Sequence, residues 1–562
     1  MSMNEKIENQ LNLALELPEA EREKSESLMI GTNGKQWELI IRFESLEEAR
    51  KIPGIQIKEL QNGYAIINID EERIETLAGL PGIIYIEKPK ALEFSVVTGK
   101  RASCIDGVQV ENTFGLTGEG VLVGVIDSGI DYTHPVFRNP DGTTRIVKLW
   151  DQVTDRIYDR EEINKALKSS EPFQIVPSRD VTGHGTHVAG IAAGNFAENP
   201  EEHLGIATRS SLLIVKMATA SDNSFPRTSR LMEGVDFVVQ EARRMQMPLS
   251  LNISFGNSYG SHDGNSLLDT YLDSVINDNR ISVQIGTGNE GDGIGHAGGV
   301  VEEGITTEVE FQVAGFQSGF NIQLWKDFSD VFVVQVIAPS GERTDFLREG
   351  ERVRKFQIDQ TNVAVLYGMP VPYSKYQEIY MEFIPEENYV TPGIWTIQIF
   401  PERIRVGNYD LWLPGTRVVN ENTGFLMPEP LTTLTVPSTS LKAISVGAYD
   451  VRNDTVAAFS GRGFLRETNQ VKPDLVAPGV EIVSAAVGGG LTRMTGTSMA
   501  TPFVTGSAAL MMEWGIVRGN DPFLYGEKLK AYLLRGARKV PGTTFVPNPI
   551  SGWGALCLRD SL

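Results

Sequence analysis

Cysteine is nearly absent from this chain of 562 residues, which contains only Cys104 and Cys557. Neither lies in a motif with a histidine partner, so a catalytic cysteine is not expected. The N-terminal stretch MSMNEKIENQLNLALELPEAEREK lacks the basic start and the apolar block that are typical of a secretory signal. We therefore expect no export signal, a protein made in the cytoplasm, and two buried thiols rather than a disulfide.

Long apolar runs and an excess of basic charge are absent as well. No uninterrupted apolar run approaches the roughly 18 residues that a membrane span needs, so no membrane insertion is expected. The 51 lysines and arginines are outnumbered by 72 aspartates and glutamates, which gives a net charge of −21. This acidic balance disfavours nucleic acid and anionic membranes as partners. The composition favours a globular protein, and the length suggests two to four domains.

Residues 1–97 predict a small N-terminal domain whose regular pattern of strands and helices begins at about residue 36. Four strands and two helices are predicted in the order βαββαβ: Trp37–Phe43, Leu46–Lys51, Ile55–Leu60, Gly63–Ile69, Glu71–Leu80 and Ile83–Glu87. The Gln61-Asn62-Gly63 sequence between the second and third strands is a turn signal. This order is that of a ferredoxin-like α+β module.

Residues 98–305 and 431–562 predict one α/β domain that is interrupted by an insert. Its expected strands are near-continuous apolar runs, as in strands buried on both faces of a parallel sheet. They alternate with helix-like stretches such as Leu231–Arg244, which indicates a doubly wound, mostly parallel sheet. Between these parts, residues 306–430 consist of seven or eight short strands separated by turn residues. This pattern predicts an inserted β-sandwich or jelly roll.

Four segments of the α/β domain contain residues suited to serine attack on a peptide. Asp127 follows a buried strand in VIDSGID, where it could orient an imidazole, although a helix-capping or turn aspartate is the usual role of such a residue. His184 lies between two glycines in GHGTHVAG, at an expected helix start. His187 is expected to be a structural core histidine, because no carboxylate completes a zinc-protease spacing. No metal site is therefore predicted.

The expected nucleophile is Ser498, in GTSMATP, at the start of a predicted helix whose amide groups could stabilise an oxyanion. Asn289, in GTGNEG, could supply the second oxyanion donor, although an asparagine among glycines is commonly just a turn residue. Each segment alone would fit an ordinary cap or turn. Together they predict a catalytic triad of Asp127, His184 and Ser498.

These motifs, in the order Asp, His, Asn and Ser, closely resemble those of the subtilases, and so do the flanking segments NISFG and VKPDLVAPGVEI. The resemblance covers about residues 118–299 and 431–558. It implies a subtilisin-like fold and a serine endopeptidase that cuts a protein substrate. It further implies that Ser254, Phe255 and Gly256 line the substrate cleft and that Gly286, Thr287 and Gly288 form a pocket wall. No cofactor is expected; calcium is possible in this family, but no acidic loop has convincing ligand spacing.

The N-terminal module resembles a subtilase propeptide, and the whole architecture resembles the clostridial Csp spore-germination proteases. That resemblance implies a spore-associated enzyme that activates a precursor cortex-lytic hydrolase and keeps its own cleaved propeptide. We expect self-cleavage in the extended stretch Leu92, Glu93, Phe94, Ser95, Val96, Val97 and Thr98. The alternative is a germinant-sensing or regulatory protein on a subtilase scaffold, which the intact triad disfavours.

Overall fold

The computed structural model of the chain describes residues 6–562 except 19–21, 23–28, 30, 90–94, 111, 196–204, 218–225, 279, 352, 372–373, 416–417, 467 and 469. The chain divides into two compact units, Met1–Glu93 and Phe94–Leu562. Each unit has its own hydrophobic core, and each is described separately below.

The N-terminal unit is an antiparallel sheet covered by short helices. Its strands are β1 (Thr32–Asn33), β2 (Gln36–Phe43), β3 (Gln56–Glu59), β4 (Tyr64–Asp70) and β5 (Ile83–Glu87). The four longer strands pair in the order β5-β2-β4-β3, which is the ferredoxin-like order predicted from the sequence. The turn between β3 and β4 is also confirmed, since Asn62 and Gly63 both have positive φ, at 59° and 76°.

The helices of this unit differ from the prediction. The first expected helix is only one 3₁₀ turn, Ala49–Lys51. The second begins at Glu71 as predicted, as a 3₁₀ turn (Glu71–Arg73) that continues into α4 (Ile74–Ala78). An additional helix, α1 (Asn9–Glu16), precedes the sheet, and its Leu11 and Ala14 are buried in the core. This helix lies in the acidic N-terminal stretch and was not predicted from the sequence.

The second unit is built on a nine-stranded, mostly parallel sheet in the order β23-β22-β11-β10-β6-β9-β7-β8, with β24 paired to β22. Its strands are β6 (Leu122–Asp127), β7 (Ile146–Asp151), β8 (Arg156–Asp159), β9 (Ser211–Lys216), β10 (Leu249–Ile253), β11 (Ile281–Gly286), β22 (Ile444–Asp450), β23 (Thr455–Val456) and β24 (Leu475–Pro478). Only β8 and β23, at the two ends, run antiparallel to their neighbours. The predicted buried strands are thus confirmed, and β6 and β10 are buried at every residue.

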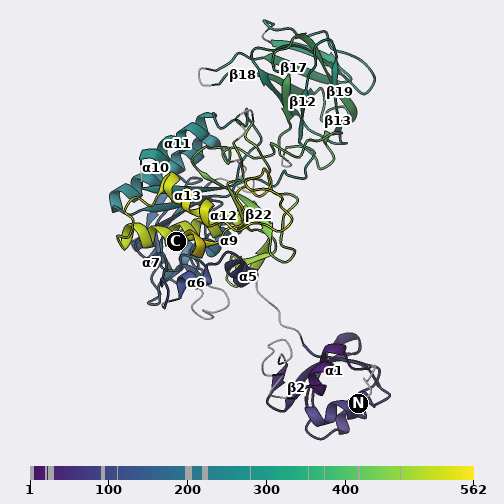
Figure 1. Ribbon diagram of the computed structural model, residues 1–562, viewed down its shortest axis with the longest axis vertical. Helices are drawn as coiled ribbons and strands as arrows, with labels where there is room; N and C mark the ends of the chain where they lie inside the picture. The colour runs from purple at the N-terminus through teal and green to yellow at the C-terminus, as the bar shows by residue number, and fades with distance from the viewer. Residues whose placement is uncertain are drawn as a thin grey trace. The chain divides into compact units, whose positions relative to one another are not determined.

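Helices cover both faces of this sheet (Figure 1). The helices α9 (His184–Ala193), α12 (Thr497–Met512) and α13 (Gly526–Gly536) pack on one face, where they share a core with α7 (Arg160–Leu167). The helices α10 (Thr228–Met245) and α11 (Leu267–Asp278) pack on the opposite face. This is the doubly wound α/β architecture predicted from the alternation of apolar runs and helical stretches. Smaller helices are α5 (Ser95–Ala102), α6 (Asp106–Gln109), α8 (Pro172–Ile175) and α14 (Leu558–Ser561).

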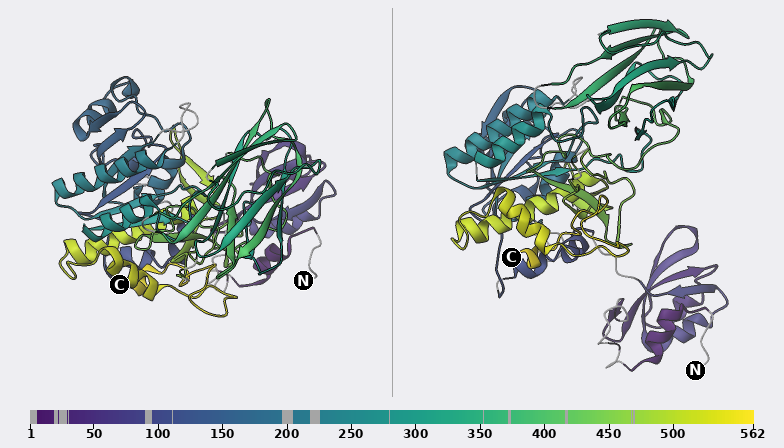
Figure 2. Two further views of the ribbon diagram at one scale, coloured as in Figure 1. Left: turned by 90° about the horizontal axis from the view of Figure 1, so that it is seen from above. Right: turned by 45° about the horizontal axis from the view of Figure 1, so that its top comes forward.

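The insert is a sandwich of two antiparallel sheets (Figure 2). One has the order β12-β20-β14-β18-β17-β16 and the other β15-β19-β13-β21. Their bounds are β12 (His296–Val300), β13 (Thr307–Val313), β14 (Phe320–Asp327), β15 (Val331–Ile337), β16 (Val353–Ile358), β17 (Thr361–Tyr367), β18 (Tyr376–Pro385), β19 (Gly393–Arg403), β20 (Asn408–Trp412) and β21 (Gly424–Phe425). The strand β12 precedes residue 306, where the sequence analysis began the insert, yet it pairs with β20 inside the sandwich.

The expectation of two free thiols is wrong, because Cys104 and Cys557 form a disulfide across 453 residues of sequence. Cys104 follows α5 and Cys557 precedes α14, and their Cα atoms lie 4.8 Å apart. The amide of Leu558 donates to Ser103 O at 2.9 Å beside the disulfide. Chain folding brings the start of the second unit against its C-terminus, which the spacing of two cysteines in sequence cannot reveal.

Candidate active site

The candidate site lies at the carboxyl edge of three adjacent parallel strands. Ile126 of β6 is in register with Ile253 of β10, which is in register with Ile285 of β11. Asp127 and Gly286, the last residues of β6 and β11, therefore lie beside Ser254, which directly follows β10. Ligands of open α/β sheets bind at this edge, where the loops leave the strands.

Asp127 and His184 are in direct contact. The Nδ1 atom of His184 lies 2.7 Å from Oδ1 of Asp127, which also accepts the Ser128 amide at 2.7 Å. The Asp127 side chain is almost fully buried, whereas the His184 side chain is one-third exposed. A buried carboxylate on Nδ1 fixes the tautomer of the ring, so Nε2 is the atom left to exchange a proton with a substrate or nucleophile.

Local sequence explains the position of His184 at the first residue of α9. Its N-cap is Gly183, whose φ of 77° lies in the left-handed region that glycine enters without strain. Gly185 packs so closely on the turn after Asp127 that a Cβ there would lie 2.2 Å from Gly129 O. Gly183 is thus required by the left-handed turn before the helix, and Gly185 by the close packing of the helix on the turn after Asp127.

A residue that the sequence analysis missed, Asp180, connects the two turns that bear Asp127 and His184. Its buried Oδ1 accepts the Ser128 hydroxyl at 2.8 Å and the Gly183 amide at 2.9 Å. Its Oδ2 accepts the amide and the hydroxyl of Thr186 at 2.9 and 2.7 Å. The Ser128 hydroxyl in turn accepts the Gly185 amide at 2.9 Å. A carboxylate four residues before the histidine, at a helix start, was the available sequence signal.

Ser498 is the second residue of α12, at the same edge of the sheet. Its hydroxyl donates to Ser254 O at 3.0 Å, and Ser254 Oγ donates to Ser498 O at 3.2 Å. Ser254 directly follows β10, the neighbour of the strand that ends in Asp127. The helix is sixteen residues long, and the partial positive charge of its N-terminus lies beside Ser498.

Asn289 faces the start of the same helix. Its Oδ1 accepts the Thr497 amide at 3.0 Å, which leaves the Nδ2 amine as the side-chain group that can bind another acceptor. A Cβ at Gly496 would lie 3.3 Å from that Nδ2 atom, so glycine keeps the space in front of it open. The structure therefore brings Asp127, His184, Asn289 and Ser498 to one edge of the sheet.

The expected cleft residues surround this edge. Ser254 is buried, and Gly256 packs against Thr435, whose Oγ1 atom would lie 2.6 Å from a Cβ there. Thr287 donates its amide to Val446 O at 3.1 Å and accepts the Thr435 amide at 3.0 Å, so Gly286–Gly288 is held from both sides. Phe255 is partly buried against the core beneath α10 and α11.

The expected self-cleavage stretch is only partly described. Leu92, Glu93 and Phe94 lie outside the described residues. Ser95, Val96, Val97 and Thr98 form the first turn of α5, whereas the sequence analysis expected an extended chain. The β-branched composition favoured an extended backbone, but α5 packs on the domain through Gly99, where a Cβ would lie 2.6 Å from the Phe503 ring. Tertiary packing here overrides local preference.

His187 is a core histidine, as the sequence analysis expected. Its Nε2 atom donates to Ile482 O at 3.0 Å, and burial lowers the pKa of the ring to about 4. Within the described ranges, no three His, Cys, Asp or Glu side chains gather as a metal ion would require. No helix in the described part of the chain is long and apolar enough to cross a bilayer.

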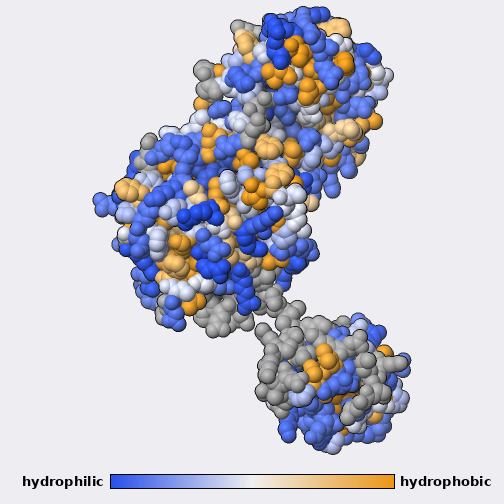
Figure 3. Space-filling model, in the orientation of Figure 1, coloured by the Kyte–Doolittle hydropathy of each residue, from blue (hydrophilic) through white to orange (hydrophobic). Residues whose placement is uncertain are grey.

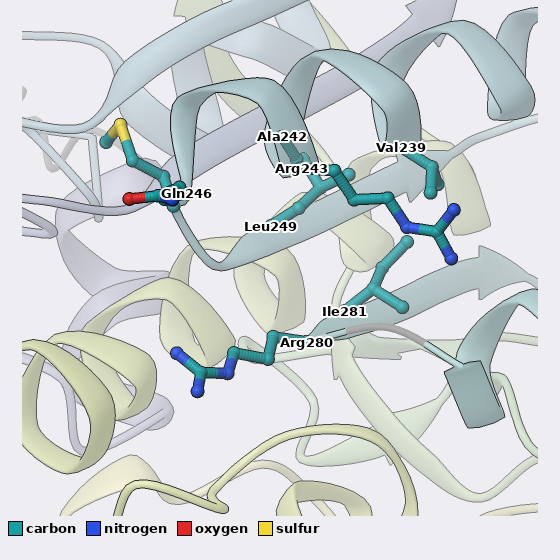
Figure 4. A pocket seen from close by; sticks show the side chains of 8 residues that line it. Val239, Ala242, Arg243, Gln246, Leu249, Arg280 and Ile281 are labelled. Carbon is teal, nitrogen blue, oxygen red and sulfur yellow. The ribbon is translucent and has the colours of Figure 1, made fainter.

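A depression of about 480 Å³ in the same domain is separate from this site (Figure 4). It lies where α10 ends and where β10 and β11 begin, at the opposite edge of the sheet. Arg243 and Arg280 border it, and Val239, Leu249 and Ile281 form its apolar lining.

Comparison with known proteins identifies the two units. The Csp protease B prodomain family matches residues 5–90, and the subtilase family matches residues 118–360 and 407–554. The structure of the Clostridium perfringens CspB protease is similar, with a TM-score of 0.78 and 38% sequence identity, over 82% of this chain and 96% of that chain.

Two curated relatives are more distant. The minor extracellular protease Vpr of Bacillus subtilis is 26% identical over 455 residues, which cover 75% of this chain and 48% of Vpr. The PII-type proteinase of Lactococcus lactis is 24% identical over 526 residues, which cover 84% of this chain and 27% of that protein. The chain thus spans between about a quarter and a half of the length of these two relatives. The family matches and the shared fold establish that this chain belongs to the subtilase family of serine proteases and carries a Csp protease B prodomain.

Proposed function

We propose that the chain is an active serine endopeptidase with Ser498 as nucleophile, His184 as general base and Asp127 as the residue that orients His184. The observation that carries this proposal is the 2.7 Å contact between His184 Nδ1 and Asp127 Oδ1 beside a helix that begins next to Ser498. In the resting chain, the Ser498 hydroxyl donates to Ser254 O. For attack it turns toward His184 Nε2, which accepts the proton as Oγ bonds to the substrate carbonyl carbon.

The oxyanion formed by this attack is stabilised by the Asn289 Nδ2 amine and by the backbone amide of Ser498, the second residue of α12. The Asn289 amide is held in position because its oxygen accepts the Thr497 amide. Preorganised donors of this kind account for a large part of the rate enhancement in acyl transfer. His184 then returns its proton to the leaving amine, and water repeats the sequence on the acyl-enzyme.

The first substrate in this proposal is the chain itself, cut between Leu92 and Thr98, so that residues 1–97 contain the propeptide. The N-terminal unit by itself leaves Ile40, Tyr64, Ile84 and Tyr85 exposed, which supports a propeptide that stays bound to a partner surface after the cut. By similarity to the Csp group, the later substrate is a protein precursor such as a cortex-lytic hydrolase in a germinating spore. The same similarity suggests a spore-associated protein.

Labelling with a fluorophosphonate probe tests the proposal, because only an activated serine reacts. Wild-type protein is expected to be labelled and to separate, on a denaturing gel, into fragments of about one-sixth and five-sixths of the 61.8 kDa chain. Ser498→Ala should remain intact and unlabelled. A folded wild type that neither reacts nor cuts itself would favour the alternative, a regulatory binding protein on the same scaffold.

A further inference from the structure

The insert exposes a pair of aromatic side chains at the end of its sandwich. Phe316, in the loop between β13 and β14, is 79% exposed, and Tyr389, in the loop between β18 and β19, is 51% exposed. Their ring centroids lie 5.4 Å apart at an interplanar angle of 86°, an edge-to-face contact. The face of the insert that Figure 3 shows is mostly hydrophilic, with scattered hydrophobic patches.

A buried side chain next to Phe316 holds this pair rigidly. Gln317 donates through Nε2 to Val418 O at 3.1 Å and accepts the Asn420 amide at 2.7 Å through Oε1. Its backbone oxygen accepts the Val390 amide at 2.9 Å. One fully buried residue thus joins the loops 314–319, 386–390 and 418–423, which we call the three-loop surface.

The backbone at Phe316 has an unfavourable conformation. Its φ of 63° lies in the left-handed region, where a bulky side chain is strained and where glycine or asparagine is ordinarily found. A strained backbone of this kind persists only when the surrounding structure holds it in place, and such residues are found mostly at functional sites. An exposed ring that is held in such a position, without packing into the core, is better explained by contact with another molecule than by stability.

The three-loop surface lies at the end of the insert that joins the catalytic site. The Phe425 amide donates to Ile294 O at 2.8 Å, five residues after Asn289, and Phe425 is in register with Phe311 on β13. The same strand leads into the loop of Phe316, whose Ala314 amide donates to the Thr423 hydroxyl at 3.0 Å. A bound protein could therefore contact this surface and reach the cleft with one segment.

The charge of the surface points to the chemistry of the partner. The three loops contain three glutamates, Glu386, Glu387 and Glu421, and no lysine or arginine; Arg417, just before the third loop, lies outside the described residues. With a net charge of −21, a second copy of this chain is a poor match. We propose that the three-loop surface is an exosite that docks a cationic, apolar segment of the protein substrate. This proposal rests on the proposed function.

Binding to full-length Ser498→Ala protein tests the exosite without cleavage. The probes are a short fluorescent peptide of alternating lysine and leucine and the matching glutamate–leucine peptide, measured by anisotropy. Phe316→Asn keeps a residue that tolerates the left-handed turn but removes the ring, so it should preserve the thermal midpoint and weaken lysine–leucine binding about tenfold. Tyr389→Ser should weaken binding in the same direction.

The matched control is Phe523→Asn, which removes a 67% exposed phenylalanine from the catalytic domain and should leave binding unchanged. Equal affinity of the two peptides, equal loss in the control, or no binding at all would overturn the exosite. Fluorophosphonate labelling of the same variants with Ser498 intact separates the two proposals. If the wild-type protein is not labelled, the proposed protease activity is contradicted. If the Phe316 and Tyr389 variants are labelled normally and still bind the peptide like the unsubstituted protein, only the exosite is contradicted.

Discussion

The carboxylate of Asp180 accepts the Ser128 hydroxyl at 2.8 Å and so joins the turn after Asp127 to the turn before His184. The same carboxylate accepts the Gly183 amide and both donors of Thr186, on either side of His184. The position of the imidazole therefore depends on Asp180, although Asp180 does not contact the reacting atoms. It is a positioning residue in the proposed mechanism.

Replacing Asp180 by asparagine should slow the reaction of Ser498 without unfolding the protein. One acceptor oxygen becomes an amine that faces the donors of Thr186 or Gly183, so the turn before His184 shifts. A small misplacement of this kind costs roughly 10²-fold in rate. The measurement is the second-order rate of fluorophosphonate labelling and its pH profile, with circular dichroism as the fold control.

Ser128→Ala provides the matched test of this network. If Asp180 acts through Ser128, the two substitutions remove one shared connection. The labelling rate of the double variant, Asp180→Asn with Ser128→Ala, should then fall by less than the two single losses predict when they are combined. Strictly additive losses, or a normal rate in Asp180→Asn, would mean that the network does not position His184.

Protein stability should fall as the pH drops from about 6.5 to about 4. Burial lowers the pKa of both His187 and His262 to about 4, below the value of about 6.5 expected in the unfolded chain. The unfolded state then binds more protons in this window, so its free energy falls relative to the folded state, by on the order of 3 kcal/mol per histidine at pH 4.

This dependence is checked by urea unfolding at several pH values. His187→Gln keeps a donor for Ile482 O but does not titrate, so its stability should decline less between pH 6.5 and pH 4. Identical slopes for the variant and the wild type would show that His187 does not contribute to acid sensitivity.

Breaking the buried ion pair between Asp410 and Arg466 should destabilise the junction of insert and catalytic domain. Arg466 Nε donates to Asp410 Oδ2 at 2.6 Å, and His296 Nε2 lies 3.0 Å from Oδ1. Asp410→Asn leaves the buried Arg466 without its counter-charge, which costs about 3–5 kcal/mol in comparable sites. Thermal denaturation should show the loss.

Asp345→Asn is the control for this change. Its pair with Arg354, at 3.3 Å, has an aspartate side chain that is 82% exposed, and exposed pairs contribute at most about 1 kcal/mol. Equal effects of the two substitutions on stability would contradict a special role for the buried pair.

The same junction bears on removal of the insert. Excising residues 306–430 alone would separate β12 from β20 and expose Arg466.

Removing the disulfide with Cys104→Ser and Cys557→Ser together should lower stability by about 2–5 kcal/mol. The bond closes a loop of 453 residues and fixes the segment after the proposed cut against the C-terminus. Guanidinium unfolding of wild type with and without reductant provides the comparison. If reductant leaves the wild-type midpoint unchanged, the disulfide does not stabilise the folded chain.

Self-cleavage should slow when the first turn of α5 is made more helical. A protease cleft binds an extended chain, yet Ser95–Thr98 are helical in the intact chain, so this turn must unwind before the cut. Val96→Ala together with Val97→Ala should stabilise the helix by about 1 kcal/mol and slow the appearance of fragments about fivefold. Val153→Ala, in an exposed turn after β7, is the control.

Faster or unchanged cleavage in the double alanine variant would show that unwinding of α5 does not limit the cut. Because alanine could also alter binding in the cleft, fluorophosphonate labelling of the same variant reports whether Ser498 itself remains equally reactive.

Short segments of the sequence are enough to predict the proposed chemistry and the core of the fold. Asp127, His184, Asn289 and Ser498 lie in short segments whose glycines and apolar neighbours already specify a strand end or a helix start. The strands β6 and β10 could be predicted because a strand buried on both faces must be apolar throughout. The turn at Asn62–Gly63 could be predicted because few residues accept positive φ. Each of these features depends on residues that are neighbours in the sequence.

The relationships between distant segments became known from the folded chain. It joined Cys104 to Cys557, placed β12 in the insert, and gathered the donors of Ser128, Gly183 and Thr186 around Asp180. It also made Ser95–Thr98 helical against their β-branched composition. Each of these features depends on which surfaces meet after folding, and packing free energy between remote residues outweighs the small local preferences that a sequence reveals.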